Sequence, residues 1–162
     1  MAVTNFTPLL GLALPTTGDL SGTWGTTVND SITSLLDSAV AGTTTLSVDV
    51  DTTLSTTNGA SNQARNAVII WTAANSVTRN ITAPAQSKTY IVVNKGNANI
   101  VLRGSGPTTG VIVPPSYAIV ATWTGSDFAI VADNIFSGGT LDRKSTRLNS
   151  SHVALSRMPS SA

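Results

Sequence analysis

Side chains that carry acid–base, nucleophilic or metal chemistry are scarce in this chain of 162 residues. It contains no Cys and no Glu, its eight acidic residues are all Asp, and its one His is His152. General acid–base and covalent catalysis depend on side chains with a tunable pKa, chiefly His, Cys, Lys and the carboxylates. The sequence therefore predicts a protein that is not an enzyme, has no catalytic residue and holds no cofactor or metal.

One pair of carboxylates has a spacing that suits cation binding. Asp49 and Asp51 are two positions apart in a predicted strand, so both side chains point to one face. Such a pair can hold Ca²⁺ together with hydroxyl and carbonyl oxygens, or it can be two solvated carboxylates at a sheet edge. The second interpretation is favoured because nothing nearby resembles an EF-hand loop. Residues 104–110 (GSGPTTG) lack the Gly-Lys-Ser/Thr ending of a P-loop and predict a plain turn.

The composition favours strands over helices. Charged residues make up 10% of the chain and hydrophobic residues 41%, while 25 Thr and 19 Ser take most of the polar positions. Five Lys and Arg scattered over the first 141 residues form no basic stripe, which argues against nucleic-acid binding. No apolar segment reaches the length of a membrane span, so membrane insertion is not expected.

Two elements precede the β-rich region. Residues 1–21, called the leader below, are apolar, and Pro8 and Pro15 bracket the run LLGLAL, which favours an extended segment. No Lys or Arg precedes this run, so it does not read as a secretory signal. Residues 22–42 predict one amphipathic helix, with Gly42 at its end.

The helix carries an apolar stripe made of Val28, Ile32, Leu35, Leu36 and Ala39. The stripe can pack on the chain's own β-domain, or it can be the seam of a short coiled coil, because its spacing averages 3.5 residues. We take the second alternative as the prediction, with these five residues at an oligomer interface.

Residues 43–136 predict an antiparallel β-domain, either a sandwich or a barrel-like fold. Turn sequences at residues 95–98 and 124–127 predict two hairpins. Short apolar strands are predicted at residues 43–50, 52–57, 67–73, 77–83, 88–94, 99–103, 111–113, 117–123 and 128–132.

Residues 137–162 predict an unstructured end whose composition departs from the rest. Residues 1–141 hold five Lys and Arg against seven Asp, a net charge of −2, whereas residues 142–162 hold four against one, a net charge of +3. DRKSTRLNSSH, from Asp142 to His152, and SRMPSSA, from Ser156 to Ala162, are similar to a translated sequencing-library adapter. We therefore expect residues 142–162 to be non-native and the biological chain to be cut near Leu141.

The N-terminal sequence resembles that of one protein family. Residues 12–15 read LALP, residues 18–25 read GDLSGTWG, and Val28-Asn29 follows. This order resembles the opening of tail-fibre and related appendage proteins of tailed bacteriophages, and the Thr-rich β-region is similar to modules of phage structural proteins.

The resemblance implies a non-enzymatic virion structural protein, the virion-proximal fragment of a tail fibre or appendage, made in the host cytoplasm and located in the phage tail. It implies a homotrimer whose partners are other tail or baseplate proteins. The leader would dock on the virion, with Leu12, Leu14 and Trp24 as docking residues. A carbohydrate-binding tailspike module and a surface-adhesin module are the alternatives.

Overall fold

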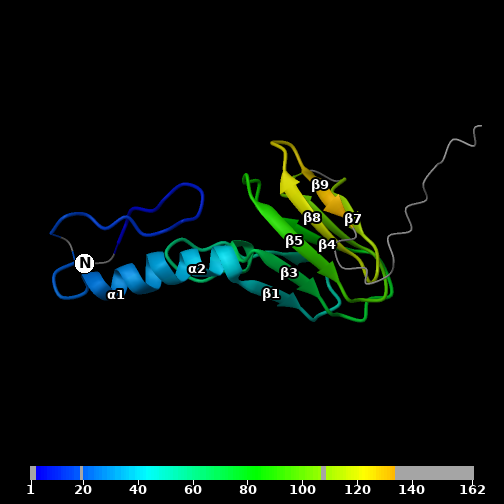
Figure 1. The fold of residues 1–162 in the computed structure, drawn as a ribbon, viewed down its shortest axis with the longest axis horizontal. Helices are drawn as coiled ribbons and strands as arrows, with labels where there is room; N and C mark the ends of the chain where they lie inside the picture. The colour runs from blue at the N-terminus through cyan, green and yellow to red at the C-terminus, as the bar shows by residue number, and fades with distance from the viewer. Residues whose placement is uncertain (1–2, 19, 107–108, 134–162) are drawn as a thin grey trace, which may run out of the picture.

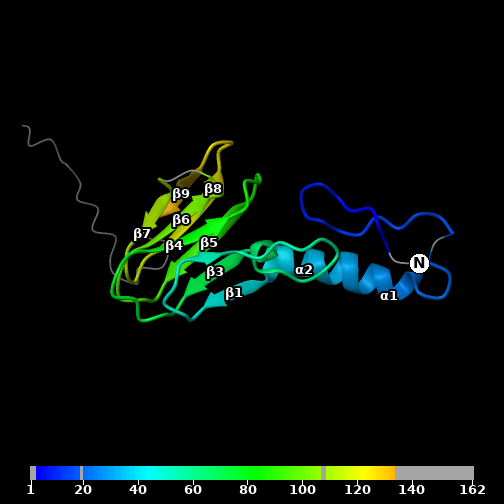
Figure 2. The same cartoon turned by 180° about the vertical axis from the view of Figure 1, so that it is seen from behind.

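The computed structural model describes residues 3–18, 20–106 and 109–133. The chain forms two parts laid end to end, as Figures 1 and 2 show from opposite sides. The arm, residues 3–41, contains the leader and one helix, and the β-domain, residues 43–133, contains the strands. The predictions of a mainly β chain and of one helix ahead of the strands are confirmed.

The helix runs without interruption from Trp24 to Ala41, close to the predicted 22–42, but its middle is not α-helical. It consists of α1 (Trp24–Val28), a π-helical turn η1 (Asn29–Thr33) and α2 (Ser34–Ala41). Gly42 follows in an extended conformation, with φ −73°, and its N–H donates to the Ser38 carbonyl at 2.9 Å. The chain therefore leaves the helix directly into the first strand rather than through a left-handed glycine.

The strands form two mixed sheets. The five-stranded sheet has the order β1-β3-β5-β8-β9, and the four-stranded sheet has the order β2-β4-β6-β7. The bounds are β1 (Thr43–Leu46), β2 (Thr52–Thr53), β3 (Val68–Trp71), β4 (Arg79–Ala83), β5 (Thr89–Asn94), β6 (Ile100–Gly104), β7 (Val111–Val113), β8 (Ala118–Trp123) and β9 (Phe128–Asp133); a short 3₁₀ turn η2 (Gln63–Arg65) precedes β3.

The prediction of an antiparallel domain is wrong for the first six strands. They alternate between the sheets, and within each sheet the neighbours are parallel, so that Thr43, Val68 and Ile91 lie side by side. Parallel partners are thus about 25 residues apart in the chain, a spacing within the range of solenoid repeats. The antiparallel pairs are β5–β8, β6–β7 and β8–β9, so each of them includes one of the last three strands. In the described residues neither sheet closes on itself, so the barrel-like alternative is also wrong.

One buried cluster draws on both sheets, and its members alternate along the strands. The five-stranded sheet contributes Leu46, Ile69, Trp71, Tyr90, Val92, Ile119, Ala121 and Phe128. The four-stranded sheet contributes Ile81, Ala83, Ile100, Leu102, Val111 and Val113. Burial of each large side chain contributes about 1.5–3 kcal/mol, which makes this cluster the main source of stability.

Two buried asparagines hold the turns where the chain crosses between sheets. The Asn94 amide donates to the carbonyls of Ala98 and Val113, at 2.9 and 2.8 Å, and its oxygen accepts from the Gly96 N–H at 2.9 Å. The Asn75 oxygen accepts from the main chain of the same turn, at Asn97 and Ala98. These bonds satisfy main-chain groups that a hairpin would have paired across strands.

The two hairpin predictions have opposite outcomes. The one at residues 95–98 is wrong, because β5 and β6 belong to different sheets and the asparagine bonds direct the turn across the core. The one at residues 124–127 is confirmed, because β8 and β9 pair antiparallel up to the Trp123–Phe128 register. No helix in the described ranges combines the length and apolar character needed to cross a bilayer.

Candidate functional site

The leader folds back on itself, so the expected extended segment is corrected. Phe6 and Ala13 form an antiparallel bridge, and the Leu14 N–H donates to the Asn5 carbonyl at 2.8 Å. The reversal is stabilised locally, since the Thr7 hydroxyl accepts from the Leu12 N–H at 2.9 Å. Pro8 lies in the turn between the bridged residues Phe6 and Ala13, and Pro15 lies two residues after Ala13.

The leader lies along the helix. The Ala13 N–H donates to the Ser31 carbonyl at 3.0 Å, and Ser31 belongs to the π-helical turn η1. Single π-helical turns inside helices are rare and frequently lie at functional positions. Ala13 and Leu20 of the leader and Leu35 of the helix are buried, so the arm covers some apolar side chains of its own.

The tip of the leader contacts the β-domain. The segment that joins β2 to β3, residues 54–67, is called the β2–β3 segment below. Its Gly59 N–H donates to the Gly11 carbonyl at 2.7 Å, and its Arg65 side chain donates to the Leu10 carbonyl. Gly11 is required at this contact, because its φ is +58° and a Cβ there would lie 2.5 Å from the Asn58 Oδ1.

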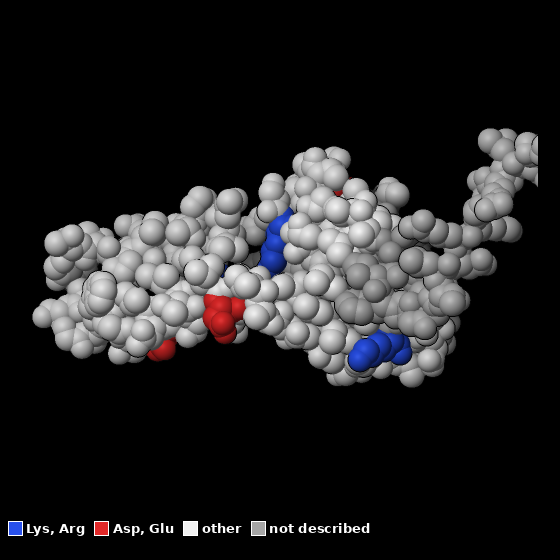
Figure 3. All heavy atoms as spheres, in the orientation of Figure 1, with Lys and Arg blue, Asp and Glu red and all other residues white. Residues whose placement is uncertain are grey.

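A pocket of about 60 Å³, the junction pocket, lies between the leader tip and the β2–β3 segment. Two cations, Arg65 and Lys88, line it, and none of its described lining residues is acidic. Figure 3 shows basic side-chain surface in the hollow between the arm and the β-domain. The remaining lining residues are Pro8, Leu9, Leu10, Gly11, Thr56, Thr57, Asn58, Asn62, Ala64 and Gln86.

Both cations donate to main-chain carbonyls. Arg65 is 4% exposed, and its Nη2 donates to Thr57 and Ala60 at 3.1 and 3.2 Å. The Lys88 Nζ donates to the carbonyl of Ala64 at 2.8 Å and to that of Arg65, and it lies 4.9 Å from the centre of the Tyr90 ring. The pocket therefore contains two positively charged side chains whose hydrogen-bond acceptors among the described residues are neutral carbonyls.

Burial shifts the titration of this cluster. Burial, and secondarily the nearby Arg65 guanidinium, lower the pKa of Lys88 to about 8. Burial also raises the pKa of Tyr90 above its ordinary value, and the Tyr90 hydroxyl donates to the Ala64 carbonyl at 2.7 Å. Near pH 7 the pocket thus holds a charged Lys88 beside a neutral Tyr90.

Sequence reasoning missed both Arg65 and Lys88. They are 23 positions apart in a chain whose basic residues are scattered, and no motif links them. The only local signal is weak: each lies just before a strongly apolar strand, β3 or β5, where a long cationic side chain is out of place.

The helix residues predicted for an oligomer interface divide into two groups. Leu35 is 3% exposed and is buried by its own chain, with Val28, Ile32 and Ala39 half-buried. Leu36 is 48% exposed, and Val40, which the stripe did not include, is 73% exposed. The large apolar side chains that α2 leaves exposed are therefore Leu36 and Val40, while Leu35 is covered within the chain.

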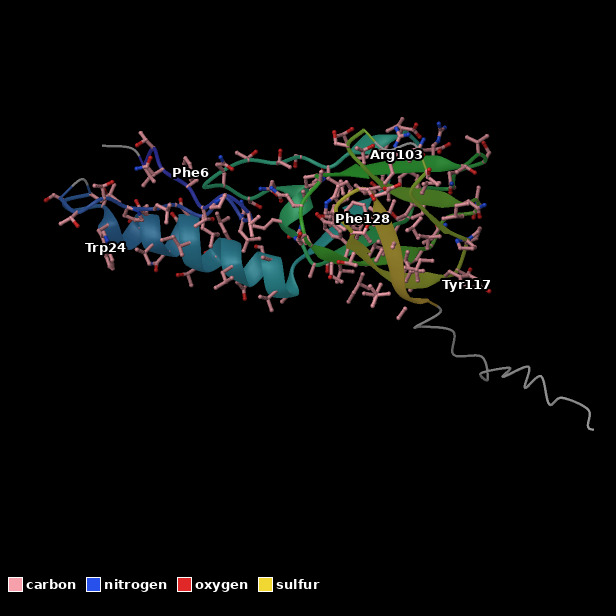
Figure 4. All side chains as sticks on the ribbon, turned by 90° about the horizontal axis from the view of Figure 1, so that it is seen from above. Phe6, Trp24, Arg103, Tyr117 and Phe128 are labelled. Carbon is pink, nitrogen blue, oxygen red and sulfur yellow. The ribbon has the colours of Figure 1, made fainter. Side chains whose placement is uncertain are left out.

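The predicted docking residues lie on the arm. Leu12 is half-buried, whereas Leu14 is exposed and Trp24 is 61% exposed. Trp24 lines a shallow depression of about 370 Å³ together with Pro15, Leu20 and polar leader residues. Figure 4 shows Trp24 at the end of the helix farthest from the β-domain. The β-domain carries Arg103, Tyr117 and Phe128, which the same figure labels.

The paired carboxylates are occupied by the chain's own donors. They lie in the connection between β1 and β2 rather than on a strand, and Asp49 accepts from the Arg79 Nε at 2.7 Å. Asp51 accepts from both the main-chain and the side-chain nitrogen of Asn80, each at 3.0 Å, and these bonds lower the pKa of Asp51. Among the described residues no three His, Cys, Asp or Glu side chains gather in a way that suits a metal ion. His152 and the whole of residues 137–162 lie outside the described residues.

Comparison with family models, with curated proteins and with solved structures finds no match to this chain.

Proposed function

We propose that this chain is a non-enzymatic structural protein of a bacteriophage virion, the virion-proximal part of a tail fibre or related appendage. The observation that carries the proposal is the end-to-end arrangement of Figure 1, in which a helical arm projects from a well-packed β-domain. Trp24 is exposed at the far end of the arm (Figure 4) and Leu14 is exposed on the leader, as an attachment point on another protein requires. The wording of residues 12–29, similar to phage appendage proteins, supports the same assignment.

The assembly proposed for this function is a homotrimer with the helices around its axis. Leu36 and Val40 are one turn apart on α2 and both are exposed, so they supply an apolar surface for neighbouring copies. For the β-domain we propose a sandwich of the two sheets, supported by the single buried cluster to which both contribute. Leu14 and Trp24 would then face the virion component on which the arm docks.

Sedimentation equilibrium of the full chain tests the assembly. We expect a trimer at tens of micromolar for the wild type and a monomer for Leu36→Asp. Ser34→Asp adds the same charge 200° away around α2 and is expected to leave the trimer intact. Leu35→Asp is a folding control, because Leu35 is buried within one chain. A monomeric wild type contradicts the trimer.

A second experiment tests the role. Trp24→Ser is expected to abolish capture of tail or baseplate proteins from the same virion while the circular dichroism spectrum is unchanged. Binding of the wild type to a glycan array, together with no such capture, would instead favour the carbohydrate-binding alternative.

A further inference from the structure

The junction pocket combines two cations, a small volume and no acidic lining residue. We propose that it binds a small oxyanion through Arg65 and Lys88, and that a carboxylate group is the preferred occupant. This inference concerns the chemistry of the pocket and does not depend on the phage assignment.

The charges of Arg65 and Lys88 favour an anionic occupant. A buried guanidinium or ammonium is normally paired with an acid, because the cost of removing a charge from water is high. The one ion pair within the described ranges joins Arg79 to Asp49, far from the pocket in the fold. Arg65 instead donates to three main-chain carbonyls and Lys88 to two others, and the described lining of the pocket contains no acidic side chain that could pair with either.

Arg65 also has an unused hydrogen-bond donor. The Arg65 Nε is buried and has no hydrogen-bond partner among the described residues, although the rest of the guanidinium is well bonded. Buried donors in native proteins are nearly always satisfied, by protein, water or a bound group. The described chain therefore leaves part of the hydrogen-bonding capacity of Arg65 unused.

The size and the lining of the pocket suit a small polar group. A pocket of about 60 Å³ is large enough to admit water molecules or a small group such as a carboxylate. Thr56, Thr57, Asn58 and Gln86 add hydroxyl and amide groups to the lining, which are neutral donors of the kind that surround bound oxyanions. The walls come from the leader tip and the β2–β3 segment, so an occupant would also hold the arm against the β-domain.

Protonation of Lys88 makes the expected binding pH-dependent. The charged and titratable groups beside it are Arg65, which stays cationic, and Tyr90, whose raised pKa keeps it neutral. Below pH 8 the pocket carries two positive charges, and above pH 8 it loses the Lys88 charge. Anion affinity is therefore highest near neutral pH, and by linkage a bound anion raises the pKa of Lys88.

The test follows the Lys88 side chain of the full chain by ¹³C NMR as the pH is raised, in sodium acetate, sodium phosphate or sodium chloride at equal ionic strength. We expect acetate to raise the pKa of Lys88 above the value in chloride and to raise Tm with concentration. The acetate affinity is obtained from the rise of Tm with acetate concentration. Lys88→Gln is expected to lower this affinity about tenfold or more. Lys95→Gln changes an exposed lysine in a turn and is expected to leave the affinity unchanged.

Each result decides between the alternatives. A response to acetate alone, or a larger response to acetate than to phosphate, supports the oxyanion pocket with a carboxylate occupant. Equal responses to both anions support an oxyanion pocket and overturn the preference for a carboxylate. A response to phosphate alone overturns the carboxylate assignment. The same Lys88 pKa in all three salts overturns the pocket as an anion site and leaves it a hydrated gap. Because this readout uses the wild type, it decides the matter even if Lys88→Gln fails to fold.

Discussion

The Arg65 guanidinium donates a hydrogen bond to the carbonyl of Leu10, a residue 55 positions earlier in the chain. The same group also bonds the carbonyls of Thr57 and Ala60, so one buried side chain holds both the leader tip and the β2–β3 segment. The Gly59–Gly11 main-chain bond reinforces this contact, and the Ala13–Ser31 bond fixes the leader to the helix. These bonds attach the leader to the helix at one point and to the β-domain at another.

Replacement of Arg65 should loosen this junction. Arg65→Met keeps most of the side-chain volume but removes the donors to three carbonyls, so we expect the free energy of unfolding to fall by about 2 kcal/mol. Limited proteolysis should then cut the leader faster than in the wild type. Arg103→Met is the control, because Arg103 makes a single long bond of 3.4 Å to the Thr82 hydroxyl. Equal urea midpoints for the Arg65→Met variant and the wild type would contradict the role given to Arg65.

Gly11 provides a second test of the leader contact. Gly11→Ala places a methyl group against Asn58 at a residue with φ +58°, whereas Gly18→Ala meets no atom within 4 Å at φ +90°. Both variants carry the penalty of a positive φ, about 1–2 kcal/mol, and only Gly11→Ala adds a clash. We therefore expect Gly11→Ala to have the lower Tm. The reverse order would show that the leader tip does not pack on Asn58.

The parts of the fold that were predictable from sequence are those with local signals. The helix follows from its apolar periodicity, and the β8–β9 hairpin follows from Thr124 to Asp127, a polar turn between two alternating strands. Parallel pairing leaves no such signal, because the partners of β3 are about 25 residues away on either side. The turn at residues 95–98 looks like a hairpin until Asn75, far upstream, is placed against it.

Asn75 should therefore be critical to the crossing between sheets. Its oxygen accepts from the Trp71 Nε1 at 3.2 Å and from two main-chain N–H groups, and its amide donates to the Val77 and Asn99 carbonyls. In Asn75→Asp a carboxylate oxygen faces those two carbonyls, so we expect a loss of about 2–3 kcal/mol at pH 7.

The matched control for Asn75 is Asn97→Asp, which makes the same change at an exposed side chain of the same turn. It is expected to stay within about 0.5 kcal/mol of the wild type. Urea unfolding at pH 7 measures both variants, and similar midpoints for the two would remove the special role of Asn75.

The candidate site was less accessible to sequence reasoning than the fold. Arg65 and Lys88 are brought together because β3 and β5 are parallel neighbours, so the residues before each strand meet at one edge of the sheet. Without the pairing, the two cations are unremarkable members of a sparse set. The helix stripe is a different case, because its periodicity predicts an apolar face but not what covers that face. Leu35 is covered within the chain, whereas Leu36 of the same stripe is exposed beside Val40.

Asp127 should make the β-domain sensitive to acid. Its carboxylate accepts from the N–H groups of Gly110, Gly104 and Phe128, at 2.7, 3.1 and 2.8 Å. Burial raises the pKa of Asp127, but these three bonds outweigh burial and hold the pKa below the ordinary 3.8. A carboxyl with a lowered pKa in the folded state stabilises the fold above its ordinary pKa, and that contribution is lost as the pH falls through the folded-state pKa.

We therefore expect Asp127→Asn to be less stable than the wild type by about 1–2 kcal/mol at pH 7. The difference should stay constant down to about pH 5 and shrink below pH 4, as the wild-type carboxyl takes up its proton. Urea unfolding from pH 7 to pH 2.5 measures it, with Asp37→Asn on the exposed face of α2 as the control. A stability difference between Asp127→Asn and the wild type that does not change with pH would show that the three amide bonds do not depend on the charge of Asp127.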